Sequence, residues 1–517
     1  MRSKSRQEIT DWLRYKTFIK DPIHGVIYLN NLEARIVDSP VFLRLHGIKQ
    51  LGFTYLVYPQ AKHSRFEHSL GSMHTAGLIA DSLVKNADEE LVEIIGREPD
   101  SLMLKELFRV AALLHDIGHL PYSHATEAVL TKGIKEGWVS GRVIEDYEYA
   151  VARNLSLHEA ITCNLIKLLV NKMKKLGKFP AGVVEASLKV LCDDEAYGYW
   201  RDFFTEDLIS IVRSVISGRI TDIDKIDYLV RDAYNTGAKF GLIDIERLVS
   251  SIKAKRINNK VKILIPAKLL SNVEDLYYAR YMMFKYVYLH HRVIATEACY
   301  EKTLKFVFDN WSTVKKSLTP ILGRTVTEAG DLFFSKKIFD YAFTKGILLD
   351  DSLVEYLLKT AYRFPGPNEK EWFDAVFLRK KTLKPLFKRE ATFHIVFSRI
   401  AEQKGLLYRD SAELLKDLYR MYEDVELLEK RISEELSKSL DCELIVKIIP
   451  PISSLKEELP LVDVDGFTVS IDKISPFISA IEKAGEAPTI FAYARRDCRD
   501  SIKAIEHLVN VLIKLSS

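Results

Sequence analysis

Three short segments of this 517-residue chain place ionisable side chains in otherwise apolar, helical surroundings. They are HSRFEH at 63–68, HDIGHLPYSH at 115–124 and DIDKIDYLVRD at 222–232. In the second segment, a stretch that is apolar nearly all round, residues 104–114, predicts a buried helix that ends directly before His115 and Asp116. An unpaired carboxylate in a protein core is costly, and a divalent cation would compensate its charge.

The nearest partners for such a cation are His68 and Asp224, which would complete a set of two imidazoles and two carboxylates. This set suits Fe, Mn, Zn, Co or Ni more than Ca, and Mg also stays open. A metal there would lower the pKa of a bound water and polarise a phosphoryl group. Beyond His115 and Asp116 in the second segment, His119 and His124 could donate protons or contact phosphate.

A structural role is the main alternative for each of these side chains. A single histidine near a helix end is more often a hydrogen-bonded residue or a partner of the helix dipole. Arg280 and Tyr288, eight residues apart on a predicted helix, are more simply a surface salt bridge and a core side chain. Composition and spacing alone therefore support a metal site and a structural role about equally.

The elements that must position these residues are predicted to be mainly helical. Residues 17–30 predict a short hairpin, 261–265 a strand and 269–309 one long helix. After residue 440, stretches such as CELIVKIIP, FTVSI and TIFAYA predict strands between helices. We expect a mainly α fold with four parts: a tail (1–16), a catalytic core (17–310), a helical extension (311–439) and a small α+β unit (440–517).

The composition excludes several other classes of protein. Hydrophobic residues make up 47% and charged residues 28% of the chain, which is typical of an ordinary globular protein. The net charge of +4 favours no nucleic-acid partner, and no zinc-finger or helix-turn-helix signature occurs. The five scattered cysteines predict no disulfide framework. Without an apolar leader or a long apolar run, we expect a cytoplasmic protein with no membrane partner.

The order H…HD…D, with long helical gaps, resembles the HD superfamily of metal-dependent phosphohydrolases. Longer strings resemble its dNTP triphosphohydrolase branch, which includes the catalytic core of the vertebrate SAM-and-HD-domain dNTPases. These strings are DPIHGVIYL, RIVDSPVFLRLHGIKQLG, HSRFEHSLG, LLHDIGHLPYSH and DIDKIDYLVRDAY. The resemblance is dense over about 17–300 and faint after about 310.

The resemblance implies a helical HD core that hydrolyses dNTPs, dGTP among them, to a deoxynucleoside and tripolyphosphate. It also implies a divalent metal ion and a homo-oligomer. The implied metal ligands are His68, His115, Asp116 and Asp224. The implied catalytic and phosphate-facing residues are His119, His124, Glu127 and His158. The implied substrate-binding residues are Gln50, Leu51, Arg65, Lys225, Tyr228, Asp232, Arg280 and Tyr288.

Some of these implied roles can be checked against physical expectations. Glu127 is one methylene longer than the aspartate of the family. Tyr228 matches the residue whose ring leaves no room for a ribose 2′-hydroxyl, and Asp232, with Gln50, matches positions that hold the 3′-hydroxyl. Asp224, Tyr228 and Asp232 are spaced by four residues, so they share one helical face. The metal ligand Asp224, the sugar contact Asp232 and the steric gate Tyr228 would thus lie together.

The chain departs from the family where the vertebrate enzyme binds an activating guanine nucleotide. Asp38 is present, but Thr17, Leu43 and His46 replace a lysine, a glutamine and an arginine of the family. Leu289 also replaces a polar neighbour of the matching tyrosine in the active site. The same guanine-triggered assembly is therefore not predicted: the enzyme is constitutively active or binds another allosteric nucleotide.

Two rival functions stay open at this point. One is another HD enzyme, a phosphodiesterase or nucleotidase with the same metal site but a different nucleotide. The other is a nucleotide-sensing or nucleic-acid-binding protein that uses the pocket without turnover. Tyr228, Asp232 and Gln50 favour a deoxyribose substrate over a generic phosphoester, and the four filled ligand positions favour an enzyme.

Overall fold

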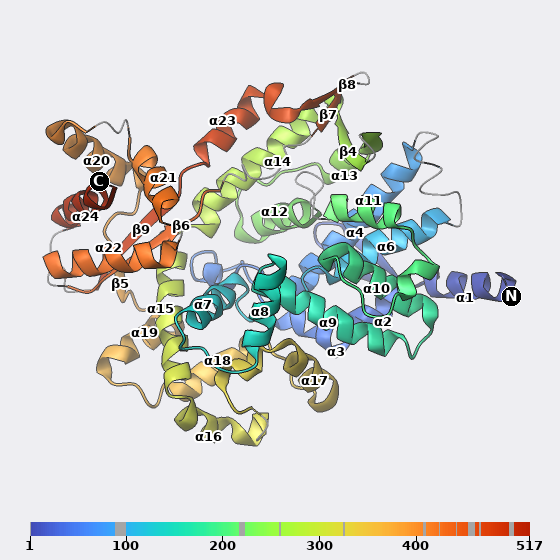
Figure 1. Ribbon diagram of the computed structural model, residues 1–517, viewed down its shortest axis with the longest axis horizontal. Helices are drawn as coiled ribbons and strands as arrows, with labels where there is room; N and C mark the ends of the chain where they lie inside the picture. The colour runs from blue at the N-terminus through green and yellow to red at the C-terminus, as the bar shows by residue number, and fades with distance from the viewer. Residues whose placement is uncertain are drawn as a thin grey trace. The chain divides into compact units, whose positions relative to one another are not determined.

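The computed structural model describes residues 2–87, 92, 100–216, 223–257, 260–323, 326–406, 410–422, 424–440, 442–452, 461–464, 467–495 and 501–516. Asp222 of the third motif lies outside these ranges. The chain divides into two compact units (Figure 1). The first comprises Met1–Met283, Val307–Thr360 and Glu458–Pro476, and the second comprises Phe284–Phe306, Ala361–Glu457 and Phe477–Ser517. Each unit combines segments distant in the sequence, whereas the predicted boundaries followed chain order.

The first unit holds the three motifs and is mostly helical, which confirms the predicted mainly α class. Its helices are α1 (Arg2–Leu13), α2 (Asn31–Val37), α3 (Pro40–Leu43), α4 (Arg65–Lys85), α6 (Asp100–Leu114), α7 (His124–Lys135), α8 (Val143–Arg153), α9 (Leu157–Met173), α10 (Lys178–Cys192), α11 (Glu206–Ile216), α12 (Ile223–Thr236), α13 (Ile245–Val249), α14 (Leu270–Met283), α16 (Trp311–Leu322), α17 (Ser335–Lys345) and α18 (Asp351–Ala361). Its strands are β1 (Tyr15–Asp21), β2 (Gly25–Asn30), β3 (Lys253–Ile257), β4 (Lys260–Pro266), β7 (Leu461–Val464) and β8 (Phe467–Ser470).

The core of this unit is a group of packed helices around α4 and α6. These two helices pack against each other, α12 packs against α4, and α10 packs against both α6 and α9. The predicted buried helix is α6, whose residues from Leu107 to Leu114 are buried. The helix α4 begins at Arg65, where the carboxylate of Glu67 accepts a hydrogen bond from the backbone N–H of Ser64 at 2.7 Å. His68 therefore lies in the first turn of a capped helix.

Two sheets belong to the first unit. The predicted hairpin is present as the antiparallel pair β1–β2. A four-stranded sheet has the order β3-β4-β7-β8, in which β4 and β7 are parallel and the other pairs are antiparallel. The predicted strand at 261–265 is β4, whereas β3 and β7 were not predicted. The strands β7 and β8 come from the region after residue 440 but pair with a strand of the core.

The second unit is built on a three-stranded antiparallel sheet of order β5-β9-β6. Its strands are β5 (Leu383–Pro385), β6 (Leu444–Ile449) and β9 (Thr489–Arg495). Its helices are α15 (His291–Asp309), α19 (Pro367–Phe377), α20 (Glu390–Lys404), α21 (Ser411–Met421), α22 (Val425–Leu440), α23 (Pro476–Ala484) and α24 (Ser501–Ser516). An apolar core forms between the sheet and α20, α21, α22 and α24. None of the described helices in either unit is long and apolar enough to cross a membrane.

The single long helix predicted for 269–309 is wrong. The helix α14 ends at Met283, a π-helical turn spans Phe284–Tyr288, and α15 begins at His291. The backbone N–H of Leu289 donates to the carbonyl of Phe284, five residues back, at 2.9 Å. A π turn shifts the helical register, so Arg280 and Tyr288 do not share one regular α-helical face.

The expectation that the cysteines form no disulfide is also wrong. Cys163 in α9 and Cys192 at the end of α10 are bonded, with their Cα atoms 5.9 Å apart. The two residues are 29 positions apart in the sequence, and neither belongs to a recognisable cysteine spacing. Only the antiparallel packing of α9 against α10 brings them together, which spacing could not reveal.

The second unit contains a half-buried carboxyl group that predicts a pH effect on stability. Burial raises the pKa of Glu297 in α15 to about 7, although Lys447 opposes the shift. A carboxyl whose pKa is raised by folding stabilises the native state below its unfolded pKa, and this stability is lost as the pH rises through about 7. We expect Glu297→Gln to raise the free energy of unfolding at pH 8 by about 1–2 kcal/mol, discounted for partial exposure, and to change it little at pH 4.5. Urea unfolding at both pH values measures the difference, and an equal effect at both would contradict it.

Candidate metal centre and active site

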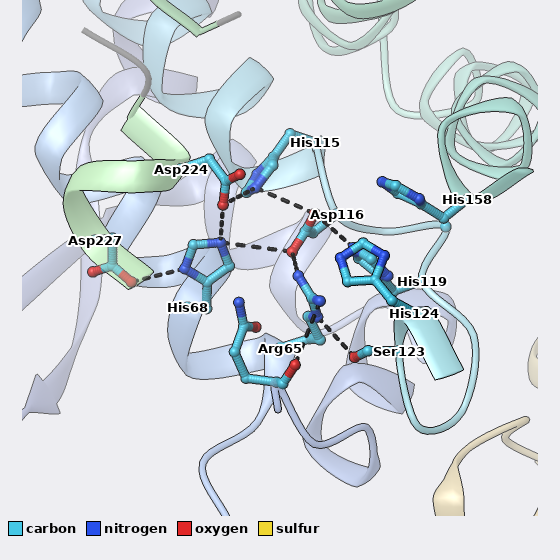
Figure 2. A network of polar contacts seen from close by, with 12 residues as sticks. Arg65, His68, His115, Asp116, His119, Ser123, His124, His158, Asp224 and Asp227 are labelled. Carbon is cyan, nitrogen blue, oxygen red and sulfur yellow. Dashed lines mark hydrogen bonds and ion pairs between the residues drawn. The ribbon is translucent and has the colours of Figure 1, made fainter. Parts of the chain in front are cut away.

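Side chains from three distant segments of the first unit converge on one point (Figure 2). His68 comes from α4, His115 follows α6, and Asp224 lies in the first turn of α12. One ligand atom from each of the three lies within 4.8 Å of the others. The Nε2 atom of His68 lies 2.9 Å from Oδ1 of Asp224, and Nε2 of His115 lies 3.7 Å from the same oxygen. The four-residue set predicted as metal ligands includes these three side chains.

The fourth predicted ligand, Asp116, lies beside the same imidazoles but has another partner. Its oxygens are 3.6 Å from Nε2 of His68 and 3.3 Å from Nε2 of His115. One of them also accepts a hydrogen bond from NH1 of Arg65 at 2.6 Å. Arg65, predicted to contact phosphate, therefore neutralises a carboxylate of the site. Its Nε donates to Oγ of Ser123 at 3.0 Å.

A divalent metal ion fits the Nε2 atoms of the two imidazoles, which both face Asp224. Nε2 of His68 and Nε2 of His115 are buried and make no hydrogen bond within the described part of the chain. The opposite nitrogen of each ring is occupied: Nδ1 of His115 donates to the carbonyl of Ala112 at 2.6 Å, and Nδ1 of His68 donates to Asp227 at 2.8 Å. Such bonds fix the tautomer that leaves Nε2 free as a ligand. His68, His115, Asp116 and Asp224 would hold the ion.

The partner of His68, Asp227, is a residue to which the sequence assigned no role. Its carboxylate is fully buried and also accepts hydrogen bonds from Nε of Arg231 at 2.8 Å and Nε2 of His24 at 2.7 Å. Arg231 in turn donates to Asp21 at 2.7 Å, so the network reaches the β1–β2 hairpin. The sequence did contain a signal for this role, because Asp227 follows Asp224 by one helical turn and precedes Arg231 by another.

The pKa shifts in the cluster show that its carboxylates stabilise positive charge on the neighbouring groups. Burial lowers the pKa of His68, but the carboxylates of Asp224 and Asp227 outweigh it and raise the pKa to about 10. The pKa of His115 is likewise raised by Asp116 and Asp224 against the effect of burial. The pKa values of Asp116, Asp224 and Asp227 lie well below the ordinary range, because neighbouring cations outweigh burial. Protons on imidazole thus supply charge that a metal ion can replace.

Three further histidines form a second cluster next to the first. The rings of His119 and His158 stack with centroids 4.1 Å apart, and the ring of His124 lies edge-on to both at 5.0 and 5.3 Å. Glu127 binds Nδ1 of His124 at 3.0 Å and Nδ1 of His158 at 2.9 Å. The longer glutamate side chain therefore still pairs with histidine. His119 is buried and its Nε2 lies 3.2 Å from Asp116, which links the two clusters.

Close packing of the turn after α6 against α9 brings these histidines together. A Cβ atom at Gly118 would overlap the backbone carbonyl of His158 and the backbone nitrogen of Thr162, so glycine is required there. The backbone N–H of Gly118 donates to Oγ1 of Thr162 at 2.9 Å, and this hydroxyl donates to the carbonyl of His115 at 3.2 Å. The start of α9, with His158, is thereby fixed beside His115, one of the candidate metal ligands.

The charges of this second cluster differ from one ring to another. Burial and the Arg65 guanidinium hold the pKa of His119 well below its usual range. The pKa of His158 is raised by Glu127 against the effect of burial, and the pKa of Glu127 is strongly lowered by His158 and His124. The imidazole of His124 is 67% exposed, so it is the accessible member. An exposed imidazole backed by an ionised carboxylate is suited to proton transfer.

The predicted sugar-binding residues lie around His63. The backbone N–H of Gln50 donates to the carbonyl of His63 at 3.0 Å, and Nε2 of His63 lies 2.7 Å from Oδ1 of buried Asp232. Leu51 follows Gln50 in the same loop, and both are at least half-buried. The role of His63 was missed, although it stands in the first motif. Its partner is 169 residues away, so spacing gave no indication.

The remaining predicted substrate residues lie on three different elements. Tyr228 is half-buried in α12, with its ring centroid 6.4 Å from that of His68. Lys225 follows the ligand Asp224 in the same helix. Arg280 lies in α14, which packs against α12. Tyr288 belongs to the second unit, so its part in a nucleotide pocket stays a prediction.

Comparison with known proteins agrees with this geometry. Residues 65–177 match the HD domain family. This range includes three of the four expected metal ligands, His68, His115 and Asp116, and all three residues of the histidine cluster. This chain contains an HD domain. A solved structure of a hypothetical protein from Aquifex aeolicus is similar in fold to this chain, with a TM-score of 0.56 over 95% of this chain and 99% of that one, at 22% sequence identity.

Two curated relatives are each matched by about half of this chain. An uncharacterised protein of Methanocaldococcus jannaschii is 36% identical over 53% of this chain and 46% of its own length. The deoxynucleoside triphosphate triphosphohydrolase SAMHD1 of Homo sapiens is 30% identical over 53% of this chain and 41% of its own length. The chain thus spans less than half the length of these two relatives.

Proposed function

We propose that this HD-superfamily protein is a metal-dependent phosphohydrolase that cleaves dNTPs, dGTP among them, to a deoxynucleoside and tripolyphosphate. The observation that carries the proposal is the convergence of His68, His115 and Asp224, with the buried Nε2 atoms of both rings facing the carboxylate, beside the carboxylate-backed histidine cluster. The similarity to SAMHD1, whose name states that activity, supports the choice of substrate class.

The cationic and proton-carrying groups suit attack on a phosphate ester. A bound divalent ion would polarise a phosphoryl oxygen and lower the pKa of a bound water. Arg65, held between Asp116 and Ser123, supplies a fixed cation for a polyanionic substrate, as does Lys225 in α12. His124 would donate a proton to the departing oxygen, and its hydrogen bond with Glu127 supports this role by orienting the ring.

The proposed sugar contacts would favour deoxyribose over ribose. Asp232 and Gln50, gathered around His63, would accept and donate hydrogen bonds to the 3′-hydroxyl. The ring of Tyr228, close to His68, would leave no space for a hydroxyl at C2′. An added hydroxyl there would be crowded and desolvated without a partner. Homo-oligomerisation and an activating nucleotide stay predictions of the family resemblance.

One experiment tests this function directly. The purified protein is incubated with each of four dNTPs and four NTPs in the presence of Mg²⁺, Mn²⁺ or Co²⁺, and the products are separated by chromatography. We expect tripolyphosphate and deoxynucleoside from the dNTPs. Release of pyrophosphate or orthophosphate would instead favour a phosphodiesterase or nucleotidase, and binding without turnover would favour a nucleotide sensor.

Replacing Tyr228 with alanine tests the steric gate. We expect Tyr228→Ala to reduce the ratio of kcat/KM for dNTP over NTP by about 10- to 100-fold, because the ring no longer excludes the 2′-hydroxyl. Tyr228→Phe keeps the ring and should keep the ratio, which makes it the matched control. Steady-state kinetics with dGTP and GTP measures both. A Tyr228→Ala ratio equal to that of the wild type would refute the gate.

A further inference from the structure

A carboxylate outside the HD match connects two loops of the active site. Asp351, the first residue of α18, is buried, with 2% of its surface exposed. Its Oδ1 accepts a hydrogen bond from the backbone N–H of Tyr122 at 2.6 Å. Its Oδ2 accepts from the backbone N–H of Lys49 at 3.2 Å and from Nζ of Lys49 at 3.0 Å. One side chain therefore fixes residues that are 73 positions apart in the sequence.

Both loops continue directly into the site. The carbonyl of Lys49 accepts a hydrogen bond from Oγ of Ser123 at 2.8 Å, and this oxygen accepts from Nε of Arg65 at 3.0 Å. Arg65 then pairs with Asp116. A displacement of the Lys49 or Ser123 backbone would therefore move the guanidinium that faces Asp116.

The loop that Asp351 holds has an unfavourable backbone conformation. Tyr122 and Ser123 have φ angles of 56° and 53°, values that residues with a side chain rarely adopt. They stand immediately before His124, the first residue of α7. The ring of Tyr122 also stacks on Phe53 with centroids 4.5 Å apart. Such a conformation persists only where surrounding contacts enforce it, and the hydrogen bond to Asp351 is one of those contacts.

The residue two positions before Asp351 is tied to the turn that follows α6. The carbonyl of Leu349 accepts a hydrogen bond from NH1 of buried Arg44 at 3.2 Å, and NH2 of Arg44 donates to the carbonyl of Ile117. Ile117 directly follows the ligand Asp116. The segment 349–351 is thus connected to the turn after α6 and to the loop before α7.

We propose that Asp351 is a positioning residue for the hydrolytic reaction. It holds the loops of residues 49–51 and 120–124 so that His124 and Arg65 stay in place beside the metal ligands. The expected effect of Asp351 on turnover rests on the proposed function. Its role in holding the two loops does not. Asp351 itself touches neither the metal ligands nor the histidine cluster in any contact recorded for the described residues.

The variant Asp351→Asn removes the charge and one of the two accepting oxygens. We expect kcat with dGTP to fall about 10- to 100-fold, because small displacements of reacting groups have effects of this size, while bound metal stays at the wild-type level. Hydrogen exchange, followed by mass spectrometry, should become faster in residues 49–52 and 120–128. A purely structural residue would lower the unfolding temperature without lowering the kcat of the folded enzyme.

Asp146→Asn is the matched control. Asp146 is a buried carboxylate that also accepts three hydrogen bonds, from N and Oγ of Ser335 and from Nδ2 of Asn164. It joins α8, α9 and α17 away from the histidines. We expect Asp146→Asn to lower the unfolding temperature with kcat within about twofold of the wild type.

The proposal is overturned if folded Asp351→Asn has a kcat within twofold of the wild type. If that variant does not fold, Lys49→Met removes the ion pair of Nζ with Asp351 and its contacts with the rings of Tyr55 and Tyr122, but keeps the backbone hydrogen bond to Asp351. It should lower kcat about 3- to 10-fold; an unchanged kcat would overturn the proposal. If the wild-type protein hydrolyses no nucleotide, the proposed function has failed, and hydrogen exchange alone decides the role of Asp351. Unchanged exchange in both loops would then overturn it.

Discussion

The variant Asp224→Asn is expected to lose both bound metal and turnover, with kcat reduced by about 1,000-fold or more, equivalent to about 4 kcal/mol of transition-state stabilisation. The carboxylate of Asp224 is within 2.9 Å of Nε2 of His68 and 3.7 Å of Nε2 of His115, so it is the anionic member shared by both rings. An amide keeps the shape but removes the charge that attracts a cation. Elemental analysis of the purified variant and product chromatography measure the two losses.

The matched controls for this prediction lie on the same framework. His115→Ala removes a different ligand and should give the same double loss. Asp81→Asn changes an exposed carboxylate on α4, which pairs with Lys105 at 2.6 Å on the surface, and should leave metal and turnover near wild-type values. If His115→Ala kept near-normal activity, the assignment of the metal site would be wrong.

The variant Asp227→Asn is expected to weaken metal binding by about 10- to 100-fold without removing a ligand. Asp227 accepts the Nδ1–H of His68 at 2.8 Å, which keeps Nε2 free and increases the basicity of the ring. An asparagine has the same size as the aspartate and still fits beside Gly71. A residue with a Cβ atom in place of Gly71 would overlap the Asp227 carboxylate. Isothermal titration of the metal-free protein with Mn²⁺ or Co²⁺ measures the change in affinity.

Asp232→Asn provides the comparison for that experiment. It breaks an equivalent contact, from His63 to Asp232 at 2.7 Å, on the same helix α12. Because His63 is not among the metal ligands, metal affinity should stay unchanged, although substrate binding should weaken. Circular dichroism confirms that both variants are folded. Equal metal affinities for Asp227→Asn and the wild type would show that Asp227 only supports the structure.

Sequence reasoning succeeded where the signal was local. The β1–β2 hairpin, the buried helix α6 and the position of His115 and Asp116 after its end follow from patterns within about fifteen residues. The four-residue spacing of Asp224, Tyr228 and Asp232 correctly placed them on one helix, α12. The ligand set itself came from the resemblance, because spacing alone left a structural role equally open.

The failures concern features that depend on contacts between distant segments. The disulfide of Cys163 with Cys192 requires α9 and α10 to pack side by side, and the sheet β3-β4-β7-β8 joins strands about 200 residues apart. The π turn at Phe284–Tyr288 interrupts a stretch whose apolar spacing is helical throughout. No local pattern distinguishes these outcomes from their alternatives.

Local sequence signals were enough to show which side chains are available to bind a cation and to place each of them in a helix or directly after one, since helix periodicity and capping are properties of neighbouring residues. Tertiary structure alone decided which groups support them. Asp227 became the partner of His68, His63 the partner of Asp232, and Asp351 the anchor of the loop before His124, across separations of 159 to 229 residues. Buried charges and backbone N–H groups must find partners, and only the packed fold determines which ones lie within reach.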